Sequence, residues 1–419
     1  MQQTKLQQNK TFSITILLVF MIIFEILFKF PNKFLIRMKN FYISNITMMK
    51  NQYLLFFLFF PFFFYGQNII AEDSLSIISM ESQVIGVDSI DNAKSKKKES
   101  IFDFISKDEI FEMTLEADFD SLLFHKKRSV VYIPGKVSFK NAELEEMNFK
   151  VKIKPRGKYR RKVCEFPPLR LKFKKKGLKK MGLSRKHNSL KLVSHCLDNK
   201  REAKQNILKE YLIYKIYNLH SEYSLRVQLI KINYVQSGSG KKLFDRMGIL
   251  LEDDDELAQR TNSEVVKKKY CSVDSIDSYH GTIHAMFQCM IGNADWSMTH
   301  MRNVKVLRPQ PNSLLCTFPY DFDFSGFVSA SYAIPNPDYK LYNTKQRVFL
   351  GKMYSEEEMK KVAKHFLSQK EATIQLCNDF DLLSKRCKKD VIKYLKSFYK
   401  ILEDEEKMAM ELNKLCPKK

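Results

Sequence analysis

Strand-like segments come first in this chain and helix-like segments come last, and this order limits the folds that it can adopt. Six segments have the alternation of apolar and polar residues, or the short apolar run, that is typical of strands. They are 129–139, 148–157, 168–176, 189–196, 224–235 and 245–252. Strands that are followed by helices, instead of alternating with them, predict an α+β fold.

Helical periodicity dominates the rest of the chain. Apolar residues recur at helical spacing over 199–221, and a mostly helical stretch leads through 278–296. From Ser355 onward they recur every three or four positions, which predicts two or three amphipathic helices that pack on the body. The segments 303–307 and 314–324 between these helices are expected to form a short hairpin.

Composition excludes a disordered chain but does not select a function. The 419 residues are 44% hydrophobic, which is enough for a large core. The formal net charge of +24 would suit a protein that binds nucleic acid, a membrane surface or an anionic substrate. No specific nucleic-acid motif accompanies the charge, so its distribution matters more than its sum.

The N-terminal part divides into three segments. Residues 48–67 contain a lysine, a core of about a dozen apolar residues and then Gly66, the pattern of a secretory signal peptide. In that case translation starts at Met48 or Met49, and residues 1–47 are an upstream extension that is not part of the protein. The exported protein would be located in the periplasm, at the cell surface or outside the cell. The alternative is a membrane anchor made of two short apolar helices, in which case the N-terminal segment is the only membrane contact. Residues 68–108 are rich in Ser, Asp and Lys and are expected to form a flexible linker before a folded domain at 109–419.

Eight cysteines lack a CxxC pair, which argues against a zinc ribbon. An even number of cysteines in an exported protein permits disulfides. Cys164 and Cys196 flank one basic β-rich segment and are the first candidates for a bond. Two unconnected buried thiols are the alternative.

The sequence QSGSGKKLF at 236–244 contains GSGK but is not a phosphate-binding loop. That motif requires a glycine where this chain has Val235 and a Ser or Thr where it has Lys242. A Gly/Ser hairpin turn between two strands is predicted instead.

Oxygen-bearing side chains gather in GNADWSMTHMRN (292–303) and PYDFDFSG (319–326). Asn303 would open one strand of the hairpin and Asp321 would end the other, which would bring them together. Asp321 and Asp323 alternate in an expected aromatic strand, where two carboxylates on one face repel each other unless a cation lies between them. The pattern therefore favours a divalent cation such as Mg²⁺ or Mn²⁺ at Asp321 and Asp323. In the alternative, Asp295 and Asn303 only bond to nearby backbone groups in turns.

Basic side chains precede these acids. In PLRLKF the residues Arg170 and Lys172 share the strand face opposite the apolar residues, and Arg156 precedes a glycine in KPRGKY. Cations that project from a sheet can bind phosphates, although a solvated face or a patch for acidic polymers would look the same. The order of cations, then Asp295, Asn303 and Asp321, is the order that phosphoryl transfer to a hydroxyl group requires in protein kinases.

The motifs together resemble the CotH family of atypical secreted kinases. The resemblance covers about residues 110–350 and rests on RG-x-x-R, FPPLRLKF, KLVSHC before a Tyr-rich helix, GILLEDDDELAQR, GNADWS and PYDFDFSG. It implies a kinase-like two-lobed fold with a β-rich N-lobe and a mostly helical C-lobe.

The resemblance also implies a function and roles for individual residues. The protein would be an ATP- and Mg²⁺-dependent phosphotransferase that acts on Ser or Thr of exported or surface proteins. Asp295 would act on the acceptor hydroxyl, and the metal would be held by Asn303, Asp321 and Asp323. The nucleotide-binding residues would be Arg156, Arg170, Lys172, Glu210, which orients a cation, and Glu252, near the adenine.

Two features depart from the family pattern. Asn303 follows Asp295 by eight positions, whereas the kinase loop has five, so three residues must bulge out. Pro167 and Pro168 occupy the neighbourhood where family members carry a lysine. The alternative function is a non-catalytic surface protein that uses the same body to bind acidic polymers or partner proteins.

Overall fold

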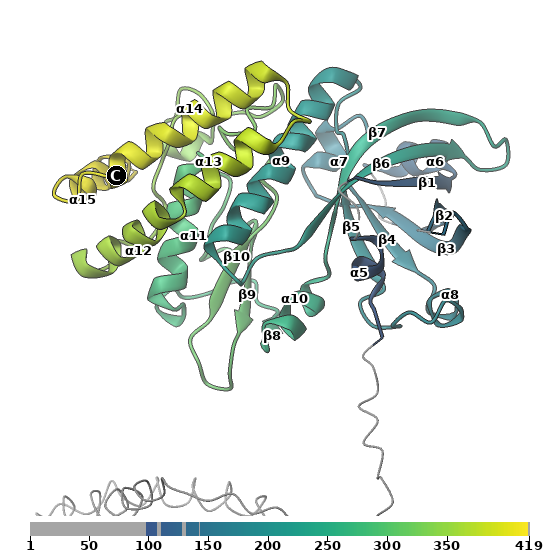
Figure 1. Ribbon diagram of the computed structural model, residues 1–419, viewed down its shortest axis with the longest axis horizontal. Helices are drawn as coiled ribbons and strands as arrows, with labels where there is room; N and C mark the ends of the chain where they lie inside the picture. The colour runs from purple at the N-terminus through teal and green to yellow at the C-terminus, as the bar shows by residue number, and fades with distance from the viewer. Residues whose placement is uncertain (1–97, 107–109, 128–130, 142, 418–419) are drawn as a thin grey trace, which may run out of the picture. The chain divides into compact units, whose positions relative to one another are not determined.

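The computed structural model describes residues 98–106, 110–127, 131–141 and 143–417. Within these ranges, seven strands form a closed barrel. The order around the barrel is β1-β2-β3-β4-β5-β7-β6 (Figure 1). The strands are β1 (Phe111–Ala117), β2 (Ile133–Lys140), β3 (Glu146–Pro155), β4 (Leu169–Phe173), β5 (Ser189–Val193), β6 (Val227–Gln236) and β7 (Lys242–Leu251). Short helices α5 (Ile101–Ile105), α6 (Phe119–His125), α7 (Arg160–Val163) and α8 (Lys175–Lys180) connect or flank them.

Alternation within the strands fills the barrel interior. In β4 the side chains of Leu169, Leu171 and Phe173 are buried, whereas Arg170 is half-buried and Lys172 is exposed. The prediction that the two cations share one face of this strand is confirmed. Buried residues of the seven strands and of α5 and α6 join in one apolar cluster.

The predicted kinase-like two-lobed fold is wrong, because the β-rich half closes into a barrel. Closure depends on β1, which pairs with β2 in antiparallel fashion and with β6 in parallel fashion, Phe111 opposite Ile230 and Ala117 opposite Gln236. The strand β1 was absent from the predicted set. Its pairing with β6 joins segments more than a hundred residues apart, which no local pattern encodes.

A mostly helical half lies beside the barrel and is formed by α9, between β5 and β6 in the chain, and by the elements after β7 (Figure 1). Its helices are α9 (Lys200–His220), α10 (Asp254–Arg260), η2 (Val273–Ser275), α11 (Ser278–Met290), η3 (Pro337–Tyr339), α12 (Glu356–Ser368), α13 (Lys370–Asp379), α14 (Lys385–Leu402) and α15 (Met408–Lys414). A small sheet has the order β10-β9-β8, with β8 (Glu264–Val266), β9 (Val304–Arg308) and β10 (Cys316–Pro319). The predicted hairpin is confirmed as β9 and β10, with Val304 opposite Pro319.

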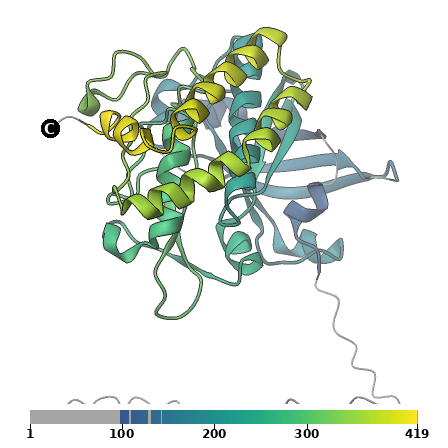
Figure 2. The ribbon, with the colours of Figure 1, turned by 60° about the vertical axis from the view of Figure 1, so that its left-hand side comes forward.

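The helix α9 connects the two halves. It begins at the cap residue Asn199, whose side chain accepts from Glu202 N–H, and it packs against β6 and β7 on one side and α13 on the other. In Figure 2 the C-terminal helices α12 to α14 lie in front, where α12 packs on α11 and α13 on α9. The tail therefore has four helices where two or three were predicted, and they cover the second apolar core.

The N-terminal predictions have different outcomes. The extension at 1–47 and the signal peptide at 48–67 lie outside the described residues. Within the predicted linker, however, α5 buries Ile101, Phe102 and Ile105, so folded structure starts before the expected boundary at residue 109. Among the helices that the structure describes, none has the length and apolarity to cross a membrane.

The predicted bond between Cys164 and Cys196 is present. It links the segment after α7 to the segment after β5, where Phe166 N–H also donates to the Cys196 carbonyl oxygen at 3.3 Å. The predicted turn between β6 and β7 is also present, and Gly238 and Gly240 both have positive φ there, as a tight turn of this kind requires.

A buried histidine lies against the apolar cluster of the barrel. The His195 ring stacks on Phe166 with 4.8 Å between centroids, and neither of its ring nitrogens has a hydrogen-bond partner among the residues that the structure describes. Burial, together with the charge of Arg246, lowers the pKa of His195 to about 3.

Replacing His195 with phenylalanine should therefore have a pH-dependent effect on stability. The unfolded chain takes up a proton at His195 below about pH 6.5, whereas the folded protein does not, so acid destabilises only the wild type at this position. Between pH 7.5 and pH 5 the variant should gain about 2 kcal/mol in free energy of unfolding relative to wild type. Urea denaturation at the two pH values measures this difference, and a difference that does not change with pH would rule out a neutral buried imidazole.

Candidate active site

Arg160 lies at the centre of a cluster of three carboxylates. It is the first residue of α7 and is almost fully buried. Its Nη2 atom lies 3.4 Å from Glu210 Oε1 of α9 and 2.6 Å from Asp323 Oδ1, and it also pairs with Asp321. We call Arg160, Glu210, Asp321 and Asp323 the arginine–carboxylate cluster. It joins the barrel to the helical half, because its members come from α7, α9 and the segment after β10.

Asp321 and Asp323 do not lie on a β-strand, as the sequence had predicted, but in a turn that brings both carboxylates to Arg160. The strand β10 ends at Pro319, and Asp321 has φ of 70°, so Asp321 and Asp323 do not alternate along a strand. Asp321 N–H donates to the Tyr214 hydroxyl at 3.0 Å, which fixes the turn. The expected cation between the carboxylates exists, but in the structure it is the guanidinium of Arg160.

Asp295 and Asn303 form a hydrogen-bonded pair. Asn303 Nδ2 donates to Asp295 Oδ2 at 2.9 Å and to the Asp295 carbonyl oxygen at 2.7 Å. Between them, Ser297 and Arg302 exchange two backbone hydrogen bonds of 3.0 Å, so the intervening residues fold into a tight loop. The predicted bulge is confirmed. The hairpin then places Asn303 beside the aspartates, because Tyr320 N–H donates to its carbonyl oxygen at 3.1 Å.

Two lysines lie on the barrel side of Tyr320. Lys191 of β5 and Lys305 of β9 both bind Asp254, the first residue of α10, and Lys191 Nζ is 2.5 Å from Asp254 Oδ1. Their ammonium groups lie 5.9 Å and 5.4 Å from the centroid of the Tyr320 ring. We call Lys191 and Lys305 the lysine pair.

Arg156 and Arg170 complete the group of cations around the lysine pair. The Arg156 charge acts on Asp321 and Tyr320 on one side and on both lysines on the other. Arg170 is opposite Lys191 in the β4–β5 ladder, and its charge also acts on both lysines. Only one carboxylate, that of Asp254, pairs with the lysine pair in the described structure, so this side has an excess of positive charge.

The pKa values of these groups reflect burial among like charges. Burial lowers the pKa of Lys191 to about 7, and the charges of Arg156 and Arg170 contribute to the decrease. The pKa of Lys305 falls to about 5, through burial and then through Lys191. The two lysines share the single carboxylate of Asp254, and an additional anion that binds beside them favours their charged forms.

The carboxylates shift in the opposite direction. Burial raises the pKa of Asp295, and the Asp321 carboxylate raises it further against the opposing charge of Arg302. Burial also raises the pKa of Asp323 to about 7, although Arg160 counteracts the effect. Carboxyl groups with raised pKa values are suited to accept a proton near neutral pH.

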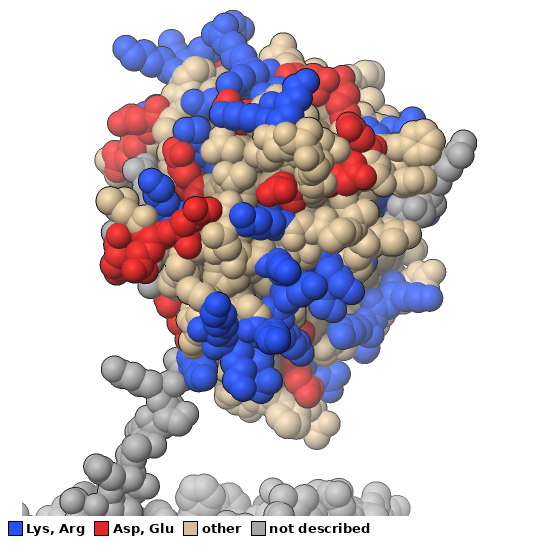
Figure 3. Space-filling model, turned by 90° about the vertical axis from the view of Figure 1, so that its right-hand side faces the viewer, with Lys and Arg blue, Asp and Glu red and all other residues tan. Residues whose placement is uncertain are grey.

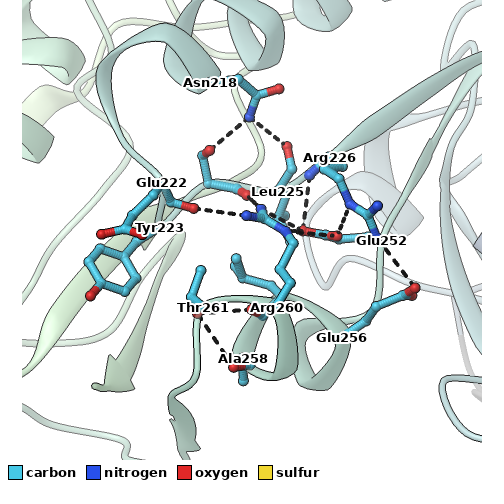
Figure 4. Close-up of polar contacts among 12 residues, drawn as sticks. Asn218, Glu222, Tyr223, Leu225, Arg226, Glu252, Glu256, Ala258, Arg260 and Thr261 are labelled. Carbon is cyan, nitrogen blue, oxygen red and sulfur yellow. Dashed lines mark hydrogen bonds and ion pairs between the residues drawn. The ribbon is translucent and has the colours of Figure 1, made fainter. Parts of the chain in front are cut away.

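Two residues of the predicted nucleotide site, Lys172 and Glu252, lie outside the group of cations. Lys172 is exposed on the barrel, in register with Lys152 and Ser189, and forms no ion pair in the part of the chain that is described. Glu252 follows β7 as predicted, but its carboxylate is fully buried and both oxygens are bound by arginines. Figure 4 shows Glu252 between Arg226, with Nε 2.6 Å from Oε2, and Arg260, with Nη2 2.9 Å from Oε1. Its carboxylate therefore holds β6, β7 and α10 together.

Sequence reasoning missed four residues of the site. Arg160 and Lys191 lie in the motifs RG-x-x-R and KLVSHC, but the sequence patterns assigned neither residue a role in the site. Lys305 and Asp254 gave no local signal, because each is one charged residue in an ordinary strand or acidic helix start. The buried cation in a short apolar strand, Lys191 in SLKLV, was the one detectable anomaly.

Some of the carboxylate oxygens that were predicted to bind a divalent metal form ion pairs with Arg160 instead. No group of three or more His, Cys, Asp or Glu side chains within the described ranges is arranged to hold a metal ion, and Arg160 forms ion pairs with Asp321, Asp323 and Glu210. Asp321 remains a quarter exposed, and its charge acts on the nearby Asp295. Mg²⁺ commonly uses only one or two side chains together with phosphates and waters, so Asp321 and Asn303 fit such an ion when phosphates supply the other ligands.

Comparisons with known proteins give no assignment. A scan against protein-family models finds none that matches the chain, and a search of curated proteins finds no match either. The case for a function therefore rests on the site itself.

Proposed function

We propose that the protein transfers the γ-phosphoryl group of ATP to Ser or Thr hydroxyl groups of exported or surface proteins. One observation carries the proposal: a group of cations with few counterions lies at Tyr320, whose N–H donates to Asn303, and the charge of one of them, Arg156, acts on Asp321 of the arginine–carboxylate cluster. Phosphoryl transfer requires little covalent chemistry from a protein. It requires cations for the phosphates and a carboxylate that is aligned with the attacking hydroxyl.

Asp295 is the residue that would act on the acceptor. Its raised pKa and its partial exposure suit a carboxylate that takes the hydroxyl proton as the new oxygen–phosphorus bond forms. The bond between the γ-phosphorus and the bridging oxygen of ATP breaks in the same displacement, and ADP leaves with that oxygen. Asn303 would hold the Asp295 carboxylate in position through its 2.9 Å hydrogen bond.

The cations would bind the triphosphate. Lys191, Lys305, Arg156 and Arg170 approach the same region from β5, β9, the end of β3 and β4. Their burial strengthens the attraction for an anion, because little water screens it. Arg160 would act indirectly, by fixing Asp321 beside Asp295.

A divalent ion would be held by Asp321 and Asn303 together with phosphate oxygens. Bound there, it would spread the negative charge of the transferred group.

The proposed location outside the cytoplasm has separate support. The bond between Cys164 and Cys196 is of a type that persists in oxidising compartments. It agrees with the signal-peptide pattern of residues 48–67.

A thermal-shift measurement with ATP and Mg²⁺ tests the binding step. A ligand that binds only the folded state at 100 times its Kd adds about 2.7 kcal/mol of stability, so the transition should move upward by several degrees. Lys191→Gln should lose this shift, whereas Lys172→Gln should keep it. The second variant is a matched control, because it removes a cation from the neighbouring strand that makes no contact with the site. Equal shifts in both variants, or no shift in wild type, would contradict the proposed site.

Nucleotide affinity should also depend on pH through Lys191. Its pKa of about 7 in the free protein must rise when phosphates bind, so binding takes up a proton above pH 7. Lys191 should contribute an increase in Kd of up to about tenfold per pH unit from pH 7 to pH 9, in addition to any proton uptake at Lys305. Calorimetric titration measures the slope, and Lys191→Arg should reduce it by the Lys191 contribution because arginine stays charged. An equal slope in the two proteins would show that Lys191 does not contact the nucleotide.

A further inference from the structure

The segment 166–197 has an unusual charge. It contains ten Lys and Arg residues and no Asp or Glu. It spans β4, α8 and β5, and its exposed cations cluster on α8 and the following loop. Figure 3, which faces the barrel end of the molecule, shows Lys and Arg side chains gathered over the lower part of this face.

A pocket of about 640 Å³ opens among these cations. Seven residues from the first described segment, α8 and the loop after it line the pocket. They are Lys98, Lys175, Lys179, Leu183, Ser184, Arg185 and Lys186. Five of the seven are cations and none is acidic, and the volume lies within the range of ordinary ligand sites. We call it the α8 pocket.

The walls of the α8 pocket are fixed by the fold. Leu178 and Leu183 are buried in the barrel cluster, and Leu183 N–H donates to the Leu178 carbonyl oxygen at 2.9 Å. Ser184 N–H donates to the Glu99 carbonyl oxygen at 2.8 Å, which ties the loop to the segment that carries Lys98. The cations therefore project from a rigid frame.

None of the five cations forms an ion pair within the described residues. The adjacent pocket differs, because its carboxylates Asp103 and Glu256 are both paired with Arg226. The α8 pocket thus concentrates positive charge that no described side chain neutralises. Repulsion of this kind persists at a cost in stability and favours a polyvalent anion.

We infer that the α8 pocket binds a ligand that carries several phosphate groups. Five point charges around one cavity exceed what a single carboxylate or phosphate can neutralise, and lysine is a common phosphate-binding residue. The Ser184 hydroxyl adds a neutral donor at the wall. The phosphates belong either to a soluble polyphosphate or to a phosphorylated lipid headgroup. This inference does not depend on the proposed phosphotransferase activity, because the α8 pocket shares no residue with the candidate active site.

Binding of inorganic tripolyphosphate to the full chain provides the first test. Calorimetric titration in about 0.1 M salt should detect binding to the wild type. The triple variant Lys175→Gln, Lys179→Gln, Lys186→Gln should bind at least about tenfold more weakly, because the loss of one charge-assisted hydrogen bond is enough to lower the affinity about tenfold. The matched control is Lys267→Gln, Lys268→Gln, Lys269→Gln, which removes three exposed lysines from the loop after β8 and should keep the wild-type affinity. Equal losses in both triple variants would overturn the inference, as would no binding in wild type.

A labelling measurement on the wild type keeps the test independent of how the variants fold. Tripolyphosphate should protect Lys175, Lys179 and Lys186 from acetylation and leave the exposed Lys267 and Lys268 reactive, as read by mass spectrometry. Uniform protection, or none, would contradict a local site.

Binding to vesicles distinguishes the two sources of phosphate. Stronger retention on vesicles with a bisphosphorylated phosphoinositide than on phosphatidylcholine vesicles assigns the pocket to a headgroup, whereas binding of tripolyphosphate without this retention assigns it to a soluble ligand.

Discussion

Replacing Asp295 with asparagine is expected to lower the rate of phosphoryl transfer by about 10²- to 10⁴-fold, the usual contribution of a general base. The amide is nearly isosteric but cannot accept the hydroxyl proton. The hydrogen-bonding position beside Asn303 stays filled, so the free energy of unfolding and the affinity for ATP should change little. Steady-state transfer from ATP to a mixed protein acceptor measures the rate.

Asp274→Asn is the control for this substitution. Asp274 is highly exposed and pairs with Lys352 at 2.8 Å, in the helical half but outside the site. It should retain the wild-type rate. Full activity in Asp295→Asn would exclude Asp295 as the base, and equal loss in both variants would point to a general effect of removing an acid.

Replacing Arg160 with methionine should produce the largest loss of stability at the site. The substitution removes the only cation that the described structure places among Glu210, Asp321 and Asp323, and it leaves these carboxylates to repel one another. Removing one partner of a buried ionic network costs about 3–5 kcal/mol. Urea denaturation at pH 7.5 measures the loss.

Two comparisons make this prediction specific. Arg161→Met, at the adjacent residue, removes a half-buried arginine that donates to the Lys126 carbonyl oxygen at 3.1 Å, and it should cost about 1 kcal/mol. Adding Glu210→Gln to Arg160→Met should recover part of the stability, because one buried negative charge disappears. A loss for Arg160→Met no larger than that for Arg161→Met would mean that the arginine–carboxylate cluster does not hold the two halves together.

The sequence patterns were informative where each element depends on its own residues. Alternation located β2 to β7, and helical periodicity located α9 with a shift of one residue at each end. The pairing of Asn303 with Asp295 and the hairpin that places it beside Asp321 were predictable, because each depends on a short stretch of chain. The bond between Cys164 and Cys196 followed from their positions around one β-rich segment.

The parts that could not be predicted depend on contacts between distant segments. The barrel closes through β1, a strand with two exposed or half-exposed glutamates whose parallel partner β6 lies far along the chain. Lys191 stands out as a cation in an apolar strand, but its partners Asp254 and Lys305 lie far along the chain and give no local signal. The argument for Asp321 and Asp323 assumed a continuous strand, but the left-handed backbone at Asp321 turns the chain and directs both carboxylates to Arg160.

The most direct test is phosphate transfer itself. The full chain is incubated with Mg²⁺ and ATP labelled on its γ-phosphate, in the presence of a mixed protein acceptor. Label should appear on Ser or Thr with the wild type, disappear with Asp295→Asn and Asp321→Asn, and persist with Asp274→Asn. No transfer by a wild-type protein that binds ATP, or equal transfer by all four proteins, would contradict the proposed phosphotransferase.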